Sequence, residues 1–365
     1  PPRVGTLGLA WWAVPLVLLA LFLPIAWHHF RYLQPSLVVF VPFLAIGAAT
    51  LDAGIARLRG RGHTPFVLGT VTACLVFTSF SWPDLLGRNA RDIREQQVAL
   101  GRWIAANVPE GAVVAANDVG ALAYLGGRRL LDLEGIVSMK LLPDALEGEG
   151  SIYAAMLRED PDLYVIFPAW FDSSFRSGAL EIRRYARLTD QSISGGEVMV
   201  VATLVEEVAA SAARPPAMAE GERIVDVLDV SDRADEAAHG AWFDDAQPGR
   251  GRGNTVVAAS YDGGAPIVDS ARRLHEAAGF RVDRGGKSRL VGRFGPSEGP
   301  ARLLVRVDGA DVGVWEVPSV PKDTWRDVSF DLPGTGPADV TILPLSVPSG
   351  PKGGWHLARL WTVGG

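Results

Sequence analysis

The chain has 365 residues, of which 48% are hydrophobic, a formal net charge of −6 and a single cysteine. This length is sufficient for two or three domains, and one cysteine excludes a disulfide scaffold. The negative net charge gives no reason to expect a nucleic-acid partner.

The sequence begins with Pro-Pro-Arg, without a methionine, and we interpret it as a piece of a longer polypeptide. Three nearly uncharged runs follow: Leu7 to Trp27, Ser36 to Ile55 and Phe66 to Trp82. Each has roughly 17 to 21 residues, the length that spans a bilayer core. The first run is too long for the apolar part of a signal peptide and carries tryptophans at both ends. Residues 1–86 are therefore predicted to form three transmembrane helices.

Charge in the short loops indicates the orientation of these helices. The loop "RLRGRGH", Arg57 to His63, is far more basic than the other short loop, "HHFRYLQP". Because basic short loops stay in the cytoplasm, we expect this loop there and everything after Trp82 outside. High Ala, Gly, Arg and Val usage is typical of a GC-rich bacterial source. The pattern predicts a multi-pass protein of the bacterial inner membrane, with its C-terminal domains on the outer or periplasmic side.

Residues 87–210 are predicted to form a small α/β domain with a largely parallel sheet. From Gly87 to Val108 the apolar positions fall on one face of an amphipathic connecting helix. Strand-like and helix-like segments then alternate: "AVVAAN", "RLLDL", "PDLYVIF" and "EVMVVATLV" as strands, "GALAYL", "SIYAAMLRED" and Leu180 to Arg187 as helices. The proline-rich stretch at 211–221 is a predicted linker.

Residues 222–365 are predicted to form an all-β sandwich, jelly-roll-like in character. Short runs rich in Val, Leu and Trp are separated by turn residues, and Asp308-Gly309 is the clearest hairpin turn. Aromatic rings of this domain could stack on sugars, but large aromatics in alternating strands more often fill the core. The tryptophans concerned are Trp242, Trp315, Trp325, Trp355 and Trp361.

Asn117 and Asp118 follow a predicted strand and precede a predicted helix, where α/β domains bind ligands. No phosphate-binding glycine motif accompanies them, and Asn or Asp before a helix is a common N-cap. Gly126-Gly127 fits the C-cap of the same helix. We therefore expect a scaffold role at this position.

Three features carry a resemblance to a known family. They are the loop "HHFRYLQP" before a span, the stretch "IREQQVALGRWIAANVPEGAVVAANDVGALAY" after the last span, and an exported C-terminal region. Together they resemble the C-terminal part of bacterial membrane glycosyltransferases of the GT-C superfamily, such as aminoarabinose transferases, protein mannosyltransferases and arabinofuranosyltransferases. The β-domain is similar to jelly-roll modules appended to some members.

The resemblance implies transfer of a sugar from a polyprenyl-phosphate donor to an envelope glycan or glycolipid acceptor on the outer face. It implies an acidic base, and a divalent cation in the full-length enzyme. The acidic residues of this family lie on a first outer loop upstream of this chain, so no catalytic residue is expected here.

The loop "HHFRYLQP" supplies the candidate ligands of the donor phosphate: His28, His29, Arg31 and Tyr32. Arg31 could fork onto phosphate oxygens while Tyr32 donates a hydrogen bond. The alternative is an ordinary interfacial loop with a snorkelling arginine.

Asp229, Asp232 and Asp235 form an acidic stretch that could hold a structural calcium ion. Their spacing is not that of an EF-hand, and a solvated acidic loop with helix-capping aspartates is the alternative.

The function predicted from the sequence is that of a C-terminal fragment of an integral membrane glycosyltransferase. The alternative is a non-enzymatic, membrane-anchored envelope protein whose exported domains bind glycan or partner proteins. Both hypotheses have the lipid bilayer as a partner.

Overall fold

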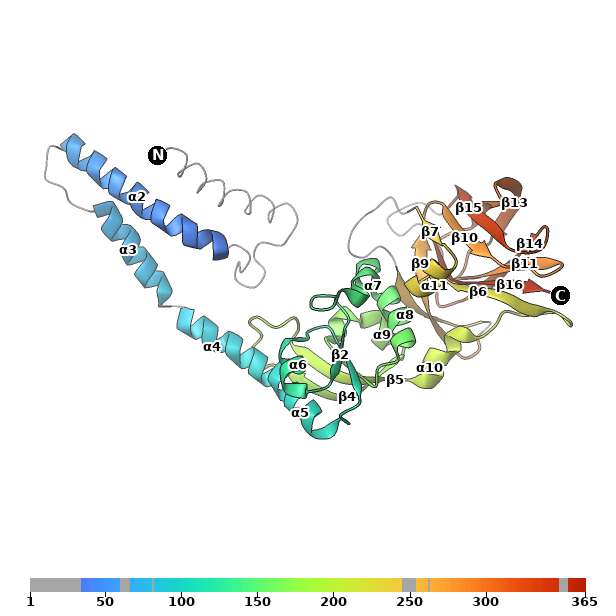
Figure 1. Cartoon of the computed structure of the whole chain (residues 1–365), viewed down its shortest axis with the longest axis horizontal. Helices are drawn as coiled ribbons and strands as arrows, with labels where there is room; N and C mark the ends of the chain where they lie inside the picture. Colours follow the sequence, from blue (N-terminus) through green and yellow to red (C-terminus); the bar gives the residue numbers. More distant parts are fainter. Residues whose placement is uncertain (1–33, 60–65, 81, 245–253, 262, 348–353) are drawn as a thin grey trace. The chain divides into compact units, whose positions relative to one another are not determined.

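The computed structural model describes residues 34–59, 66–80, 82–244, 254–261, 263–347 and 354–365 (Figure 1). The chain divides into two compact units. The first comprises Pro1–Asp92 with Asp190–Ser194, and the second comprises Ile93–Thr189 with Gly195–Gly365.

The first unit contains helices α2 (Gln34–Arg59) and α3 (Phe66–Ser79), which lie side by side (Figure 1), and most of α4 (Trp82–Ile93). The carboxylate of Asp52, 1% exposed, accepts a hydrogen bond from the backbone N–H of Val67 at 2.6 Å. The first N–H groups of a helix have no partner within the helix. Asp52 therefore joins α2 to the first turn of α3.

Among the residues that the structure describes, no helix is both long and apolar enough to cross a membrane. The predicted spans Ser36 to Ile55 and Phe66 to Trp82 are helical, but α3 has only 14 residues. At 1.5 Å per residue it is about 21 Å long, against a bilayer core of about 30 Å. The predicted span Leu7 to Trp27 lies outside the described residues. Helices are confirmed in the second and third runs, whereas their membrane-spanning character is not.

Asp92, at the end of α4, holds the segment Asp190–Ser194 of the same unit. Its buried carboxylate accepts the backbone N–H groups of Ser192 at 2.7 Å and Ile193 at 2.8 Å, and the Ser192 hydroxyl at 3.0 Å. Burial by itself raises the pKa of Asp92, but these hydrogen bonds outweigh it and bring the pKa below its usual value.

We expect Asp92→Asn to loosen the segment at neutral pH. Hydrogen bonds to a charged acceptor contribute about 1.5 kcal/mol or more, so protection of the Ile193 amide against hydrogen exchange should fall roughly tenfold. Because the pKa is lowered on folding, this protection is present above about pH 4 and is lost as the pH falls through the folded value. Asp190→Asn is the control, since Asp190 is 58% exposed and lies 3.9 Å from its partner Arg88. Equal protection in both variants would contradict the assignment.

The second unit opens with a π-helical turn, Arg94–Val98, that leads into α5 (Ala99–Asn107). Two buried glutamines in this turn connect it to the α/β domain. Gln96 donates to the carbonyls of Gly196 and Glu197 at 3.0 Å, and Gln97 donates to the Asp118 carboxylate at 2.8 Å. The predicted connecting helix is thus anchored by two buried glutamines, in addition to the apolar contacts of Leu100 and Ile104.

The α/β domain is built on a mixed five-stranded sheet of order β2-β1-β3-β5-β4. Strand β1 pairs in parallel with β2 and β3, whereas β5 is antiparallel to β3 and β4. The strands are β1 (Val113–Ala116), β2 (Arg129–Asp132), β3 (Leu163–Ile166), β4 (Leu180–Arg187) and β5 (Val198–Leu204). The parallel sheet expected from the alternation is therefore present in only part of the domain.

Two apolar cores lie on the two faces of this sheet. One contains side chains of α5 and α6, and the other contains side chains of α8 and of the segments beside it. The helices after α5 are α6 (Gly120–Gly126), α7 (Leu142–Glu147), α8 (Glu149–Glu159), α9 (Asp172–Arg176) and α10 (Glu206–Ala210), with short 3-10 turns at Met139–Leu141, Pro168–Trp170 and Ser211–Ala213.

The segment Leu180 to Arg187 is strand β4, so the helix predicted there is wrong. Its ladder with β5 joins residues that are more than ten positions apart in the chain, for example Leu180 with Leu204. The strand is mostly exposed and carries Glu181 and three arginines, so pairing with β5 decides its conformation and the local pattern could not distinguish a strand from a helix.

Two antiparallel sheets form the predicted β-sandwich. One sheet has the order β13-β12-β15-β10-β7, and the other has the order β14-β11-β16-β9-β8 with β6 also paired to β16. The elements are β6 (Arg223–Asp229), α11 (Arg233–Ala238), β7 (Trp242–Phe243), β8 (Thr255–Ala259), β9 (Ile267–Leu274), β10 (Ala278–Val282), β11 (Ser288–Phe294), β12 (Ala301–Val307), β13 (Ala310–Val317), β14 (Arg326–Leu332), β15 (Ala338–Ser346) and β16 (Trp355–Gly364). The main core lies between the sheets.

The hairpin of β12 and β13 turns at Asp308-Gly309, as predicted. Both residues have positive φ, 51° and 83°, the combination that a two-residue hairpin of type I′ requires. Four of the five tryptophans of this domain are only 1–2% exposed, which confirms the core interpretation for most of them: Trp315, Trp325, Trp355 and Trp361. Trp242 is the exception, at 48% exposed.

The sheet that contains β8 and β9 packs against the α/β domain. Tyr153 of α8 shares an apolar cluster with Val256 and Val268 of these strands. The N–H of Gly150 donates to the carbonyl of Asn254 at 3.0 Å, and a Cβ at Gly150 would lie 2.6 Å from the backbone nitrogen of Thr255. This close backbone contact accepts glycine alone.

Candidate functional site

The predicted donor-phosphate ligands, His28, His29, Arg31 and Tyr32, lie outside the residues that the structure describes. Their role stays a prediction.

The aspartates of the predicted calcium site face protein donors. Asp229 accepts the Ser231 N–H at 3.1 Å, and Asp235 accepts the Asp229 N–H at 2.6 Å. Asp232 caps α11 by accepting the Ala234 N–H at 2.9 Å, as the alternative reading expected. In the described part of the chain, no group of three His, Cys, Asp or Glu side chains is placed to hold a metal ion.

Asn117 and Asp118 do not cap α6, because the residue before this helix is Val119 and no side chain bonds its N-terminus. The Asn117 side chain instead accepts the N–H of Phe167 at 3.3 Å, and Asp118 accepts from Gln97. They connect the ends of β1 and β3 to the entering helix. The C-cap prediction is confirmed, since Gly127 has a left-handed φ of 59°.

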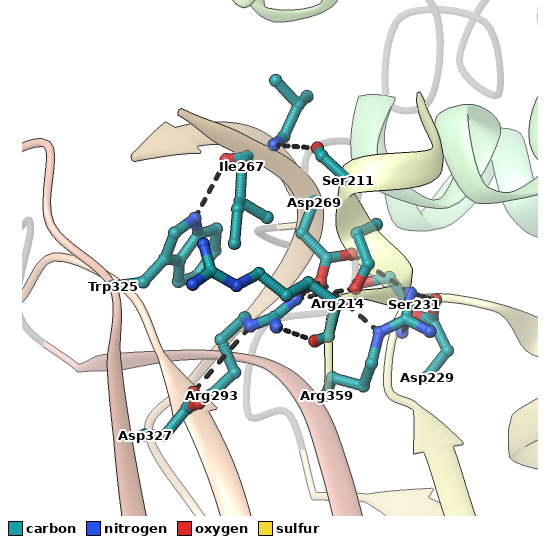
Figure 2. A network of polar contacts seen from close by, with 12 residues as sticks. Ser211, Arg214, Asp229, Ser231, Ile267, Asp269, Arg293, Trp325, Asp327 and Arg359 are labelled. Carbon is teal, nitrogen blue, oxygen red and sulfur yellow. Dashed lines mark hydrogen bonds and ion pairs between the residues drawn. The ribbon is translucent and has the colours of Figure 1, made fainter. Parts of the chain in front are cut away.

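A buried polar cluster of the second unit lies on the covered sheet of the sandwich (Figure 2). Arg293, with a fully buried side chain, pairs with Asp269 at 3.0 Å and donates to the backbone carbonyls of Ala212 and Arg214. Arg359 lies between Asp269 and Asp229, at 3.3 and 2.7 Å. Figure 2 shows these side chains pointing toward one another.

The charged groups of this cluster are paired with one another and with backbone carbonyls, so its role is structural. Burial raises the pKa of Asp229 to about 7, with Arg359 acting in the opposite direction and Asp269 adding to the rise.

Glu147 of α7 links the α/β domain to the sandwich, because it pairs with Arg272 of β9 at 3.1 Å and with Arg233 at 3.3 Å. Buried pairs of this kind fix an arrangement strongly, since removal of one partner leaves a charge uncompensated.

The other sheet of the sandwich carries the candidate site on its outer face. Trp242 of the short strand β7 lies opposite Gly279 of β10. A Cβ at Gly279 would meet the indole at 2.4 Å, so the ring rests directly on the glycine backbone. Because an isolated glycine inside a strand marks such close approaches, the sequence "AGFRV" contained a usable signal.

A recess of about 570 Å³ surrounds this indole. Its polar lining includes His239, Arg281, Asp339 and Thr341. Arg281 and Asp339 form an ion pair at 3.1 Å, with side chains 66% and 69% exposed. An aromatic face beside a few convergent donors and acceptors is the composition of a small-ligand site.

His239 supports one wall of the recess. Its ring nitrogens lie 2.8 Å from the Asp235 carbonyl and 3.2 Å from the Asp226 carboxylate, and its own carbonyl accepts the Arg281 N–H at 2.8 Å. Burial lowers the pKa of His239, but the two oxygens outweigh it and the pKa is raised. The histidine therefore fixes the end of α11 against β10 and keeps the wall in place.

The structure thus defines an α/β domain joined to a β-sandwich with one open, aromatic sheet face. Residues 89–213 match a family described as "Domain of unknown function (DUF8728)". No curated protein matches the chain.

Several solved structures that are similar to the C-terminal part are carbohydrate-binding modules. A family 35 module from Clostridium thermocellum shares 15% identity with a TM-score of 0.27, over 38% of this chain and 95% of that chain. A family 35 module from Cellvibrio japonicus Abf62 shares 15% identity with a TM-score of 0.26, over 38% and 93%. A module from Clostridium stercorarium in complex with cellobiose shares 16% identity with a TM-score of 0.24, over 38% and 92%.

Proposed function

We propose that the chain binds glycan through the outer face of the sheet that carries Trp242. The observation that carries this proposal is the half-exposed indole seated on Gly279, within a recess that also offers Arg281, Asp339 and Thr341. A sugar ring has an apolar face and a rim of hydroxyls. The indole suits the face, and the guanidinium, carboxylate and hydroxyl suit the rim.

The contrast between the two sheets supports the assignment. One outer face is covered by the α/β domain and by the polar cluster around Arg293, whereas the recess at Trp242 leaves its polar lining largely exposed. The other four tryptophans of the domain are structural. Trp242 is therefore the tryptophan of the sandwich that a ligand can reach.

The test is a glycan array probed with the 365-residue chain and with Trp242→Ala. We expect binding by the native chain and roughly a tenfold larger dissociation constant for the variant, since loss of stacking and of the buried ring face together should cost about 1.4 kcal/mol or more. Trp242→Phe should retain part of the affinity. Tyr185→Ala, which removes an aromatic 65% exposed on the α/β domain, is the control. A blank array for the native chain, or unchanged binding by Trp242→Ala, would refute the proposal.

Attachment to a membrane, with the sandwich outside the cell, is part of the same proposal. It is supported by large apolar side chains that α2 and the segment around α3 expose, among them Leu58 at 90%, Phe77 at 78% and Phe80 at 76%. Exposed apolar clusters favour an apolar surrounding. Fractionation followed by alkaline extraction tests it: recovery in the soluble fraction would refute attachment.

The sugar transfer that the sequence resemblance implies stays a prediction. It depends on upstream residues and on the loop with Arg31, so its test is transfer from a polyprenyl-phosphate sugar by the whole enzyme with Arg31→Ala. Unchanged transfer by this variant would remove Arg31 from the site.

A further inference from the structure

We infer that the glycan lies across the strands of the open sheet and reaches Arg306 and Asp311 as a second contact region beyond Trp242. This inference rests on the proposed function and specifies the ligand as a linear, neutral chain of several sugar units.

A single row of opposed residues connects the two regions. Trp242 lies opposite Gly279, and Gly279 lies opposite Thr341 of β15. Thr341 then lies opposite Arg306 of β12, which lies opposite Asp311 of β13. Opposed residues in antiparallel strands project from the same face of the sheet. The row therefore crosses five strands on the outer face.

The length of the row determines the size of the ligand. Arg306 is three strands from Trp242, and neighbouring strands lie about 4.8 Å apart, so the two side chains begin about 14 Å from each other. One sugar ring cannot touch both. A chain of three or so linked rings can, because an extended glycan advances by about one ring per strand spacing.

The charges along the row indicate a neutral ligand. Arg306 forms an ion pair with Asp311, their side chains 42% and 55% exposed, and Arg281 is paired with Asp339. Each cation thus has its own anion beside it. Exposed pairs of this kind contribute only about 0–1 kcal/mol to stability, so their donors and acceptors remain available to hydroxyl groups.

The same strands provide a matched control. Arg302 of β12 and Glu316 of β13 form an ion pair at 2.9 Å, with side chains 54% and 63% exposed. They are opposed across the same two strands but lie outside the row of Trp242. Arg302→Ala and Arg306→Ala therefore remove the same chemistry from the same surface at different places.

The experiment measures binding of the 365-residue chain to length series of neutral oligosaccharides, from one to six residues, with gluco-, xylo-, manno- and arabino-configurations. For the series that binds, affinity should rise up to about three residues. Arg306→Ala should lower the affinity for the three-residue oligosaccharide at least tenfold and leave the affinity for the single sugar unchanged. Arg302→Ala should bind both like the native chain.

The outcomes separate the two proposals. If binding depends on Trp242 but the affinity does not rise with oligosaccharide length, or is unchanged in Arg306→Ala, the cross-strand placement is wrong and the proposed function still holds. Equal losses in Arg302→Ala and Arg306→Ala would also overturn the placement. No binding to any series by the native chain overturns both.

Discussion

Replacing Asp269 by alanine is expected to destabilise the second unit by about 3–5 kcal/mol. The carboxylate is 1% exposed and lies against Arg293 and Arg359, at 3.0 and 3.3 Å. In the variant Arg293 keeps its hydrogen bonds to Tyr261 at 2.8 Å and to backbone carbonyls, but its closest remaining carboxylate is Asp327 at 3.9 Å. A fully buried guanidinium would then lack a close counter-charge, and burial of an uncompensated charge is among the largest single-residue penalties.

Chemical denaturation measures this effect directly. The control is Glu316→Ala, which breaks a pair of similar length that is more than half exposed, and which should change the free energy of unfolding by less than about 1 kcal/mol. If Asp269→Ala unfolds at the same denaturant concentration as Glu316→Ala, the cluster in Figure 2 does not stabilise the second unit.

Replacing Gly279 by valine is expected to weaken glycan binding at least tenfold, although Trp242 itself is unchanged. The first side-chain carbon would lie 2.4 Å from the indole, so the ring must leave the sheet. Valine is favourable in a strand and Gly279 has no positive φ, so the fold should persist. We expect at least a tenfold loss of affinity with little change in the free energy of unfolding.

A double variant provides the sharper measurement. Because Gly279→Val and Trp242→Ala act through one indole, their combination should bind no more weakly than either alone. Additive losses of affinity would mean that Gly279 contributes to the site in another way. Native affinity in Gly279→Val would contradict the placement of the indole on Gly279.

Much of the sandwich could be predicted from the sequence, because alternation and turn residues are local signals. The hairpin at Asp308-Gly309 and the burial of most tryptophans follow from such signals. The strand at Leu180–Arg187 could not be predicted, since its identity depends on pairing with Val198–Leu204. The partial antiparallel character of the α/β sheet has the same cause.

The candidate site was less accessible to sequence reasoning. The indole of Trp242 can rest on the sheet because a glycine 37 positions later (279 − 242) lies beneath it, and nothing near Trp242 in the chain indicates this. Arg293 alternates like an outward, solvated residue, yet the segment Ser211–Arg214 covers it. Both depend on contacts between distant parts of the chain. The N-cap predicted at Asn117 and Asp118 is wrong for the same reason, since their partners are Phe167, just after β3, and Gln97 of the π-helical turn, although the expected scaffold role holds.

The segment after α10 has a consequence for how the molecule can search for its ligand. Ser211 accepts the Val268 N–H at 2.9 Å, and the carbonyls of Ala212 and Arg214 accept from Arg293, so this connection is fastened to the sandwich along its course. A free tether of the same composition would let the sandwich sample a wide volume and would set a high effective concentration around its anchor. A fastened one does not, so a sandwich that binds glycan as proposed would reach only glycans within the range that the α/β domain allows it. Selection would operate through geometry of presentation as much as through affinity.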